Sequence, residues 1–250
     1  IVLKTKTIEG TSSDNIIDAW VYVNGNNIGV FELPSKIPIH IEGNYNLQIF
    51  PGIKKSGLAA LRVQNPFMIS YDTSINSIPN NTDTLKPRVS YEPGITMWIE
   101  DFEDPGIKFT SVSYSDTTMF ITNNASEVFE GNGTGKILFG SDDLLFECIT
   151  NELSFNNFPK GGRPVYIEMD YKSNDDISIG IYHNNSSTNL SKTNYFNLLP
   201  TNGKWKKTYI DLADEVSSKL NASEYEIYLE VNKLRSNTPE IFIDNVKVMY

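Results

Sequence analysis

The sequence predicts an all-β protein, with a small amino-terminal β module followed by a larger antiparallel sandwich. Short alternating apolar runs, bounded by Gly, Pro and Asn, recur along the whole chain. Only residues 212–220 carry apolar residues at helical spacing, which leaves strands to build the domains. Residues 72–94 lack long apolar runs and contain four prolines or glycines that interrupt any regular element. We therefore expect one domain at 1–95, ending in a connecting segment over about 72–95, and a second at 96–250.

The first domain opens with a strong hairpin pattern. Residues 18–23 and 28–33 alternate as strands, and the Asn24-Gly25 pair between them supplies the positive φ angles that a tight turn requires. Further strands are expected at 37–41 and at 45–50, where Pro51-Gly52 ends the pattern.

This order of strands and turns resembles a PEGA-like surface module, although the Thr-Pro pair of that family is missing. The matching positions are Val21, Val23, Asn24, Gly25, Gly29, Pro34, Gly43 and Tyr45. The longer string over residues 14–70 resembles predicted surface lipoproteins of Bacteroidetes. That resemblance implies a signal peptide and a lipid-bearing cysteine upstream of Ile1, and hence an extracytoplasmic protein anchored by lipid at the bacterial cell surface or outer membrane. The alternative is an ordinary small β-sandwich of a secreted protein.

The second domain is predicted to consist almost entirely of strands. The expected strands are 107–114, 117–122, 136–139, 144–155, 165–171, 177–183, 194–199, 205–212, 225–231 and 241–249. Its first and last strands, E-D-F-E at 100–103 and I-D-N-V-K-V at 243–248, resemble the two ends of jelly-roll carbohydrate-binding modules. The resemblance implies a jelly roll in which the terminal strands lie side by side and often hold a structural calcium.

A calcium site at these ends would use the carboxylates of Asp101, Glu103 and Asp244. Three unpaired carboxylates repel one another, and a hard cation with oxygen ligands relieves that repulsion. The alternative is that these acids face solvent or pair with Lys108 and Lys247. No other cofactor is expected.

Composition excludes several functional classes. Lys and Arg number 21 against 31 Asp and Glu, so the net charge of −10 makes nucleic acid an unfavourable partner. No apolar run reaches the roughly 20 residues of a membrane span, so any membrane contact would be through the lipid anchor. The single cysteine, Cys148, alternates with Phe146 on the inner face of a strand, which predicts a buried hydrophobe rather than a nucleophile.

Three strands of the second domain place tyrosines and carboxylates on the face opposite their apolar residues. Strand alternation assigns these side chains to one face of each strand. They are Tyr166, Glu168, Asp170, Tyr182, Glu226, Tyr228 and Glu230. Aromatic faces stack on sugar rings, and carboxylates accept hydrogen bonds from hydroxyl groups. We therefore expect a glycan-binding face, whose alternative is the ordinary solvated face of a sandwich.

The sequence carries no catalytic signature. Glu168-Met169-Asp170 resembles the start of the E-x-D motif of jelly-roll glycoside hydrolases, but Lys172 and Ser173 follow where the second glutamate would stand. We therefore predict a non-catalytic cell-surface protein that binds glycan through its second domain. The alternatives are a structural envelope lipoprotein that binds another protein and, more remotely, a glycosidase.

Overall fold

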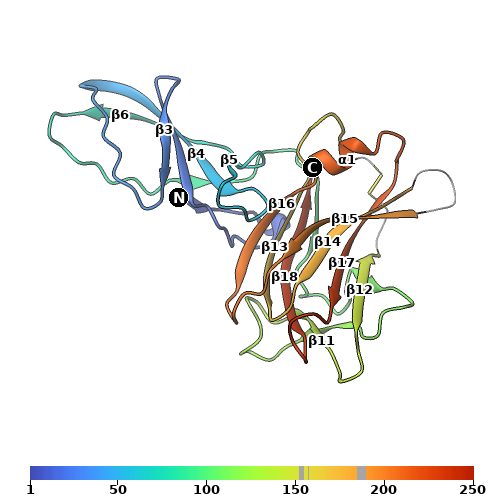
Figure 1. Cartoon of the computed structure of the whole chain (residues 1–250). Coiled ribbons are helices and arrows are strands. Elements are labelled where there is room, and N and C mark those ends of the chain that lie inside the picture. Colours follow the sequence, from blue (N-terminus) through green and yellow to red (C-terminus); the bar gives the residue numbers. More distant parts are fainter. Residues whose placement is uncertain (152–154, 157, 185–189) are drawn as a thin grey trace. The chain divides into compact units, whose positions relative to one another are not determined.

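The computed structural model describes residues 1–151, 155, 156, 158–184 and 190–250. The chain forms two compact units, Ile1–Thr96 (unit 1) and Met97–Tyr250 (unit 2). Both consist of strands joined by turns and loops (Figure 1). Each unit has its own sheets and its own hydrophobic core, so each is described by itself.

Unit 1 is built on one antiparallel sheet in which β2 and β4 are central. Its order is β3-β2-β4, and β5 and β6 pair with successive parts of β4. The elements are β1 (Val2–Leu3), the short 3-10 turn η1 (Thr7–Glu9), β2 (Asp18–Val23), β3 (Asn26–Glu32), β4 (Gly43–Lys54), β5 (Arg62–Gln64), β6 (Tyr71–Ser77) and β7 (Arg88–Val89). Strands β1 and β7 form a separate parallel pair.

The predicted hairpin of unit 1 is confirmed. Asn24 and Gly25 have φ angles of 48° and 80°, the left-handed conformation that joins β2 to β3 in a tight turn. Inward-facing residues of β2 and β4, such as Val21 and Leu47, form the core of unit 1. The strand predicted at 37–41 is absent: its isoleucines pack on this core from a loop without pairing to another strand.

Part of the expected connecting segment is a strand. Residues Tyr71–Ser77 form β6, which pairs with β4 from Gly43 to Ile49. The prediction treated 72–94 as a connection because the stretch has no long apolar run. However, Tyr71 and Ile75 pack against the core while the intervening side chains are polar, so β6 needs apolar residues only at alternate positions.

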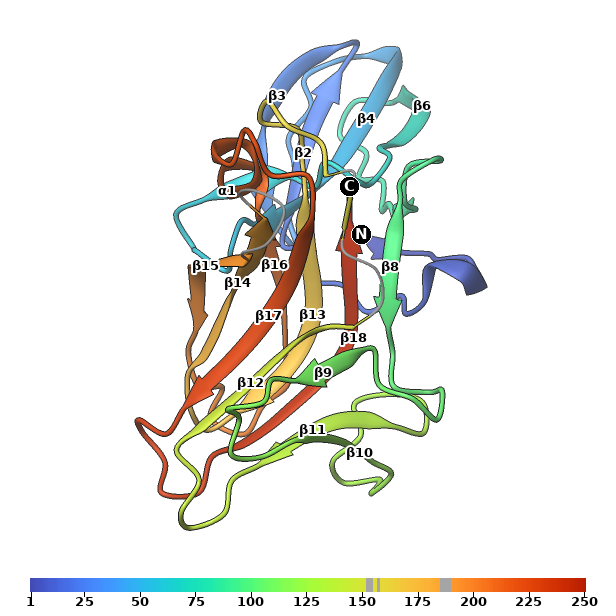
Figure 2. The ribbon, with the colours of Figure 1, turned by 90° about the vertical axis from the view of Figure 1, so that its right-hand side faces the viewer.

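Unit 2 is a jelly-roll sandwich of two antiparallel sheets (Figure 2). The first, called the β13 sheet, has the order β10-β11-β18-β13-β16, with β8 also beside β18; the second, called the β17 sheet, has the order β15-β14-β17-β12-β9. The elements are β8 (Met97–Glu100), β9 (Phe109–Ser111), β10 (Met119–Thr122), β11 (Thr134–Leu138), β12 (Leu145–Thr150), β13 (Tyr166–Ser173), β14 (Ile177–Asn184), β15 (Leu190–Leu198), β16 (Lys206–Asp211), α1 (Ala213–Ser218), β17 (Tyr225–Asn232) and β18 (Glu240–Met249).

The core of unit 2 lies between these two sheets and follows the alternation read from the sequence. Ile167 and Met169 of β13 meet Ile179 of β14 and Leu229 of β17 in one buried cluster. Cys148 is fully buried beside them, as predicted, and burial raises the pKa of its thiol. Positions 152–154 of the strand expected at 144–155 lie outside the described residues.

The terminal strands of unit 2 are neighbours. Strand β8 pairs antiparallel with β18, with Glu100 opposite Val246. The single predicted helix is α1, where the Asp211 carboxylate accepts a hydrogen bond of 2.9 Å from the backbone N–H of Ala213. No helix in the described part of the chain is both long enough and apolar enough to cross a membrane.

Candidate functional site

The structure does not bring the seven predicted ligand-binding residues onto one surface. Tyr166, Glu168 and Asp170 belong to β13, whereas the other four belong to β14 and β17 of the opposite sheet. Their inward neighbours meet in the core, so these outward side chains lie on opposite faces of the sandwich. The prediction of one shared face was therefore wrong, because alternation fixes the face of a strand but not the sheet that contains it.

The β13 carboxylates form a buried ionic cluster. The Lys207 ammonium lies 2.9 Å from Glu168 and 3.2 Å from Asp170, and Lys247 lies 3.9 Å from Glu168. All four side chains are buried. One ammonium bridging two carboxylates is the arrangement of a structural ion pair, since the charges satisfy each other.

The outward face of the β17 sheet gathers the remaining four residues. Tyr182 of β14 lies directly opposite Glu226 of β17, and Gly180 lies opposite Tyr228. Glu230 lies between Ser178 and Glu147, which are its partners on the two flanking strands. These four predicted residues therefore lie on the same side of one sheet.

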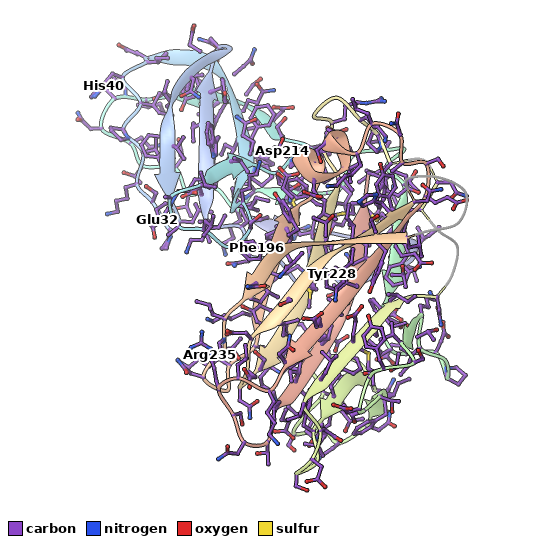
Figure 3. All side chains as sticks on the ribbon, turned by 45° about the vertical axis from the view of Figure 1, so that its right-hand side comes forward. Glu32, His40, Phe196, Asp214, Tyr228 and Arg235 are labelled. Atoms are coloured by element: carbon purple, nitrogen blue, oxygen red, sulfur yellow. The ribbon has the colours of Figure 1, made fainter. Side chains whose placement is uncertain are left out.

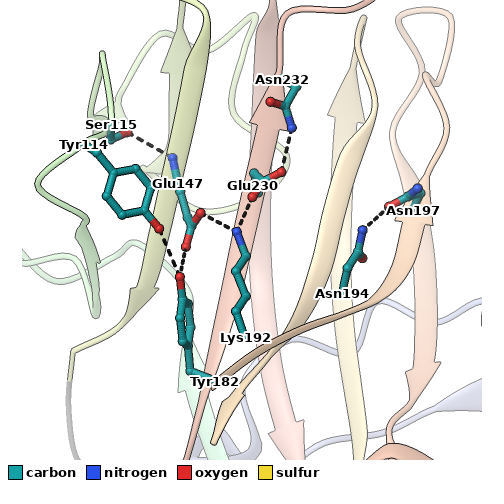
Figure 4. Close-up of polar contacts among 9 residues, drawn as sticks. All are labelled: Tyr114, Ser115, Glu147, Tyr182, Lys192, Asn194, Asn197, Glu230 and Asn232. Atoms are coloured by element: carbon teal, nitrogen blue, oxygen red, sulfur yellow. Dashed lines mark hydrogen bonds and ion pairs between the residues drawn. The ribbon is translucent and has the colours of Figure 1, made fainter. Parts of the chain in front are cut away.

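A hydrogen-bonded network crosses this surface (Figure 4). The Tyr182 hydroxyl donates to Glu147 at 2.6 Å and lies 3.0 Å from the Tyr114 hydroxyl. The Lys192 ammonium donates to the second oxygen of Glu147 at 2.5 Å and also to Glu230. These contacts join β12, β14, β15 and β17 and hold the polar groups in fixed positions. We call Tyr114, Glu147, Tyr182, Lys192 and Glu230 the tyrosine–lysine network.

Tyr228 of β17, labelled in Figure 3, adjoins Lys192 and Tyr182 of this network. A methyl group added at Gly180 would lie 2.6 Å from Cε1 of Tyr228, so the missing side chain makes room for the ring. The Lys192 ammonium covers the ring at 4.4 Å from its centroid, and Tyr182 meets it edge-on at 5.6 Å. Tyr228 is consequently fully buried and serves as the floor of the surface, not as an exposed stacking ring.

Three members of the network were missed by sequence reasoning. Glu147 alternates with Phe146 and Cys148, so its outward position was available from the pattern. No sequence pattern indicated that Tyr114 and Lys192 lie on this face, because their positions depend on which strands pair with each other. Tyr114 has 54% of its surface exposed and is the most accessible aromatic ring of the network.

Burial and hydrogen bonding have opposite effects on the pKa values of the acidic groups on this face. Burial alone would raise the pKa of Glu147, but hydrogen bonds from Lys192 and Tyr182 hold that pKa below its ordinary value. The pKa of Glu226 is raised, first by burial and then by the nearby Glu224. Burial raises the pKa of Tyr228 to about 12. The Glu147 carboxylate is therefore charged at neutral pH, and its charge is stabilised by its donors.

The proposed calcium ligands have separate hydrogen-bond partners. Glu103 accepts hydrogen bonds from the Asn132 backbone and side chain at 2.7 and 2.9 Å. Buried Asp244 accepts one from the Thr134 hydroxyl at 2.8 Å, and burial raises the pKa of this aspartate to about 7. Asp101 accepts a long hydrogen bond of 3.4 Å from the Glu103 backbone. Among the described residues, no three His, Cys, Asp or Glu side chains cluster as metal ligands would. Calcium binding stays a prediction.

No model of a protein family matches the sequence, and no curated protein matches it. Solved structures similar to this chain include a xylan-binding CBM22 domain from Paenibacillus barcinonensis, with 15% identity and a TM-score of 0.43 over 60% of this chain and 97% of that one. A family 29 carbohydrate-binding module complexed with mannohexaose has 14% identity and a TM-score of 0.41, covering 62% and 92%.

An enzymatically active domain of a bacteriophage CBA120 tailspike protein is also similar, with 12% identity and a TM-score of 0.42. The match covers 57% of this chain and only 19% of the tailspike chain. Identities and TM-scores this low do not carry a ligand or an activity from one protein to another.

Proposed function

We propose that unit 2 binds a glycan on the outward face of the β17 sheet and does not catalyse its cleavage. The observation that carries this proposal is the tyrosine–lysine network, in which the half-buried Tyr182 ring is held by Glu147. A ring with a fixed orientation offers its face to a sugar at a small cost in side-chain entropy. Carboxylate, ammonium and amide groups around it bind hydroxyl groups.

The charges of this face favour a neutral glycan over an acidic one. Glu147, Glu226 and Glu230 outnumber Lys192, and the Lys192 ammonium is already shared by two of these carboxylates. A uronate carboxylate placed here would meet an excess of like charge. The amides of Asn232 and Asn194 extend the polar surface without adding charge (Figure 4).

Glycan-array screening of the full chain, followed by calorimetric titration, tests this proposal. Tyr114→Ala removes the exposed ring and should weaken binding about three- to tenfold, the equivalent of roughly 0.5–1.5 kcal/mol for an aromatic contact. Phe120→Ala is the matched control, since Phe120 is an exposed aromatic on β10 of the opposite sheet. Equal affinities of the two variants, or no glycan binding by the full chain, would overturn the proposal.

We also propose that the protein acts outside the cytoplasm, held at the cell surface by a lipid anchor. The support is the resemblance of residues 14–70 to surface lipoproteins. Protease treatment of intact cells that express the natural gene tests it, because only a surface protein is digested. Protection from protease in intact cells but not in lysed cells would contradict a surface location.

A further inference from the structure

Unit 1 carries a groove on the outward face of its sheet. The groove has a volume of about 530 Å³, within the several hundred Å³ typical of small-ligand sites. Its lining comes from the β2–β3 turn, β4 and β6: Gly25, Asn46, Leu47, Gln48, Asp72, Thr73 and Ser74. We call it the amide groove. Because all its residues lie in unit 1, it is independent of the β17 sheet.

The turn at one side of the amide groove is held in place by β4. The backbone N–H of Asn24 donates to the carbonyl of Asn46 at 2.9 Å, and the backbone N–H of Asn46 donates to the Asn24 side chain at 2.9 Å. These two hydrogen bonds hold the turn that contains Gly25, which forms one side of the groove, against β4. The groove is therefore preformed by the hairpin, which lowers the entropy lost when a ligand binds.

An aromatic surface continues from the groove along β2 and β4. Tyr22 lies directly opposite Gln48, and its ring meets Phe50 edge-on at a centroid distance of 5.4 Å. The Tyr22 hydroxyl accepts a hydrogen bond of 3.1 Å from Gln64, which fixes the ring. Trp20 lies directly opposite Phe50, and its indole reaches Gly52, where an added methyl group would come within 2.9 Å of the ring. These half-buried rings present apolar faces beside the polar groove.

The polar side chains of the groove keep hydrogen-bonding capacity. The Asn46 amide oxygen accepts from Ser74 at 2.9 Å, while no acceptor for the Asn46 NH₂ group is found in the described part of the chain. The Gln48 side chain likewise makes no hydrogen bond to a described residue. Among the described residues, the Asp72 carboxylate accepts hydrogen bonds only from the Ser70 hydroxyl, at 3.1 and 3.2 Å. Donors and acceptors of this kind pair with adjacent hydroxyl groups.

We propose that the amide groove is a second carbohydrate-binding site, which takes a neutral oligosaccharide. Among the described residues that line the groove, Asp72 alone is ionisable and none is a cation that would attract an acidic sugar. The planar amide and carboxylate groups of the groove hydrogen-bond to the hydroxyl groups at the edge of a sugar ring. The neighbouring Tyr22 ring packs against the apolar face of the sugar. The groove lies on the face of the sheet, so a peptide strand, which would add at an edge, is not the expected occupant.

Backbone amide NMR of the full chain titrated with neutral hexasaccharides of glucose, xylose and mannose tests this site. At least one saccharide should shift signals from residues 46–48 and 72–74. Gln48→Ala and Asp72→Ala should each weaken that response about fivefold, the equivalent of roughly one hydrogen bond. Asn76→Ala is the matched control, because Asn76 is exposed on β6 beyond the residues that line the groove.

The Tyr114→Ala variant separates this inference from the proposed function of unit 2. It should leave the response of the amide groove unchanged while it weakens binding at the tyrosine–lysine network. No shift in the groove with any of the three saccharides would overturn the second site, even if unit 2 binds them. A response to oligogalacturonate alone, or equal effects of Gln48→Ala and Asn76→Ala, would also overturn it.

Discussion

The outward faces of the β17 sheet and of the unit 1 sheet share one structural feature. In each, a glycine makes room for an aromatic ring on the neighbouring strand: Gly180 for Tyr228, and Gly52 for Trp20. The surfaces above the rings differ. Tyr228 is covered by a lysine held between two carboxylates, whereas Trp20 adjoins the uncharged Phe50.

This difference separates two ways of presenting a polar surface on a sheet. The tyrosine–lysine network depends on the buried Glu147 carboxylate and the partly exposed Lys192 ammonium that pairs with it, so it should respond to pH and to loss of either partner. The amide groove combines the neutral amides of Asn46 and Gln48 with one carboxylate, that of Asp72, and its geometry comes from a turn that is hydrogen-bonded to β4.

The largest expected effect concerns the two glycines. In Gly180→Ala the new methyl would lie 2.1 Å from the backbone oxygen of Thr193, which cannot move away without breaking strand pairing, so we expect a loss of about 3 kcal/mol. In Gly52→Ala the close atoms belong to the Asp18 and Trp20 side chains, and a loss of about 1 kcal/mol follows. Urea denaturation measures both.

Gly106→Ala is the control for these variants, because a methyl group at Gly106 would meet no atom within 4 Å. It should change the free energy of unfolding by a few tenths of a kcal/mol at most. A Gly180→Ala protein as stable as Gly106→Ala would mean that neither the Thr193 backbone nor the Tyr228 ring crowds the space next to Gly180.

Removal of the lysine should affect unit 2 next most strongly. Lys192→Met leaves the Glu147 carboxylate, which is 1% exposed, without its cation. Breaking a fully buried pair costs about 3–5 kcal/mol, and the 30% exposure of Lys192 reduces the expected loss to about 2 kcal/mol. Lys172→Met is the control: Lys172 lies over the Phe242 ring at 4.2 Å, a contact of about 0.5–1 kcal/mol. Equal losses would contradict the network.

A smaller effect is expected from pH. The pKa of Glu147 lies below its ordinary value in the folded state, so its contribution is complete above about pH 4.3 and is lost as pH falls through the folded pKa. The stability difference between the natural protein and Glu147→Gln should therefore shrink as pH falls from about 6 to 3. Chemical denaturation at several pH values measures it. For Gly106→Ala, whose added methyl group would meet no atom within 4 Å, the difference should stay constant.

The smallest expected effect concerns calcium, which would act on unit 2 only. If the ion binds near Asp244, the melting temperature should rise by a few degrees between excess chelator and millimolar calcium, because a ligand of the folded state stabilises it by mass action. Asp244→Ala should abolish the rise. An unchanged melting temperature would exclude the site, and a rise that survives Asp244→Ala would place the ion elsewhere.

The sequence by itself determined the class of fold and the inner face of most strands. Alternation placed Ile167 and Leu229 in the core, and the Asn24-Gly25 pair located the first hairpin. These features are local, since the side-chain period of a strand and the φ angles of a turn depend only on neighbouring residues. Sequence reasoning missed strand β6. One face of this strand is exposed, so it needs apolar residues only at alternate positions and shows no long apolar run.

Only the tertiary structure decided which strands belong to the same sheet, and therefore which outward side chains share one face. Glu168 and Glu230 have equivalent patterns in the sequence, yet one pairs with Lys207 on the β13 sheet and the other with Lys192 on the β17 sheet. Strand order depends on contacts between residues far apart in the chain, which alternation does not encode. The amide groove likewise depends on β6 lying beside β4 with Asp72 opposite Gln48, a pairing that no local pattern specifies.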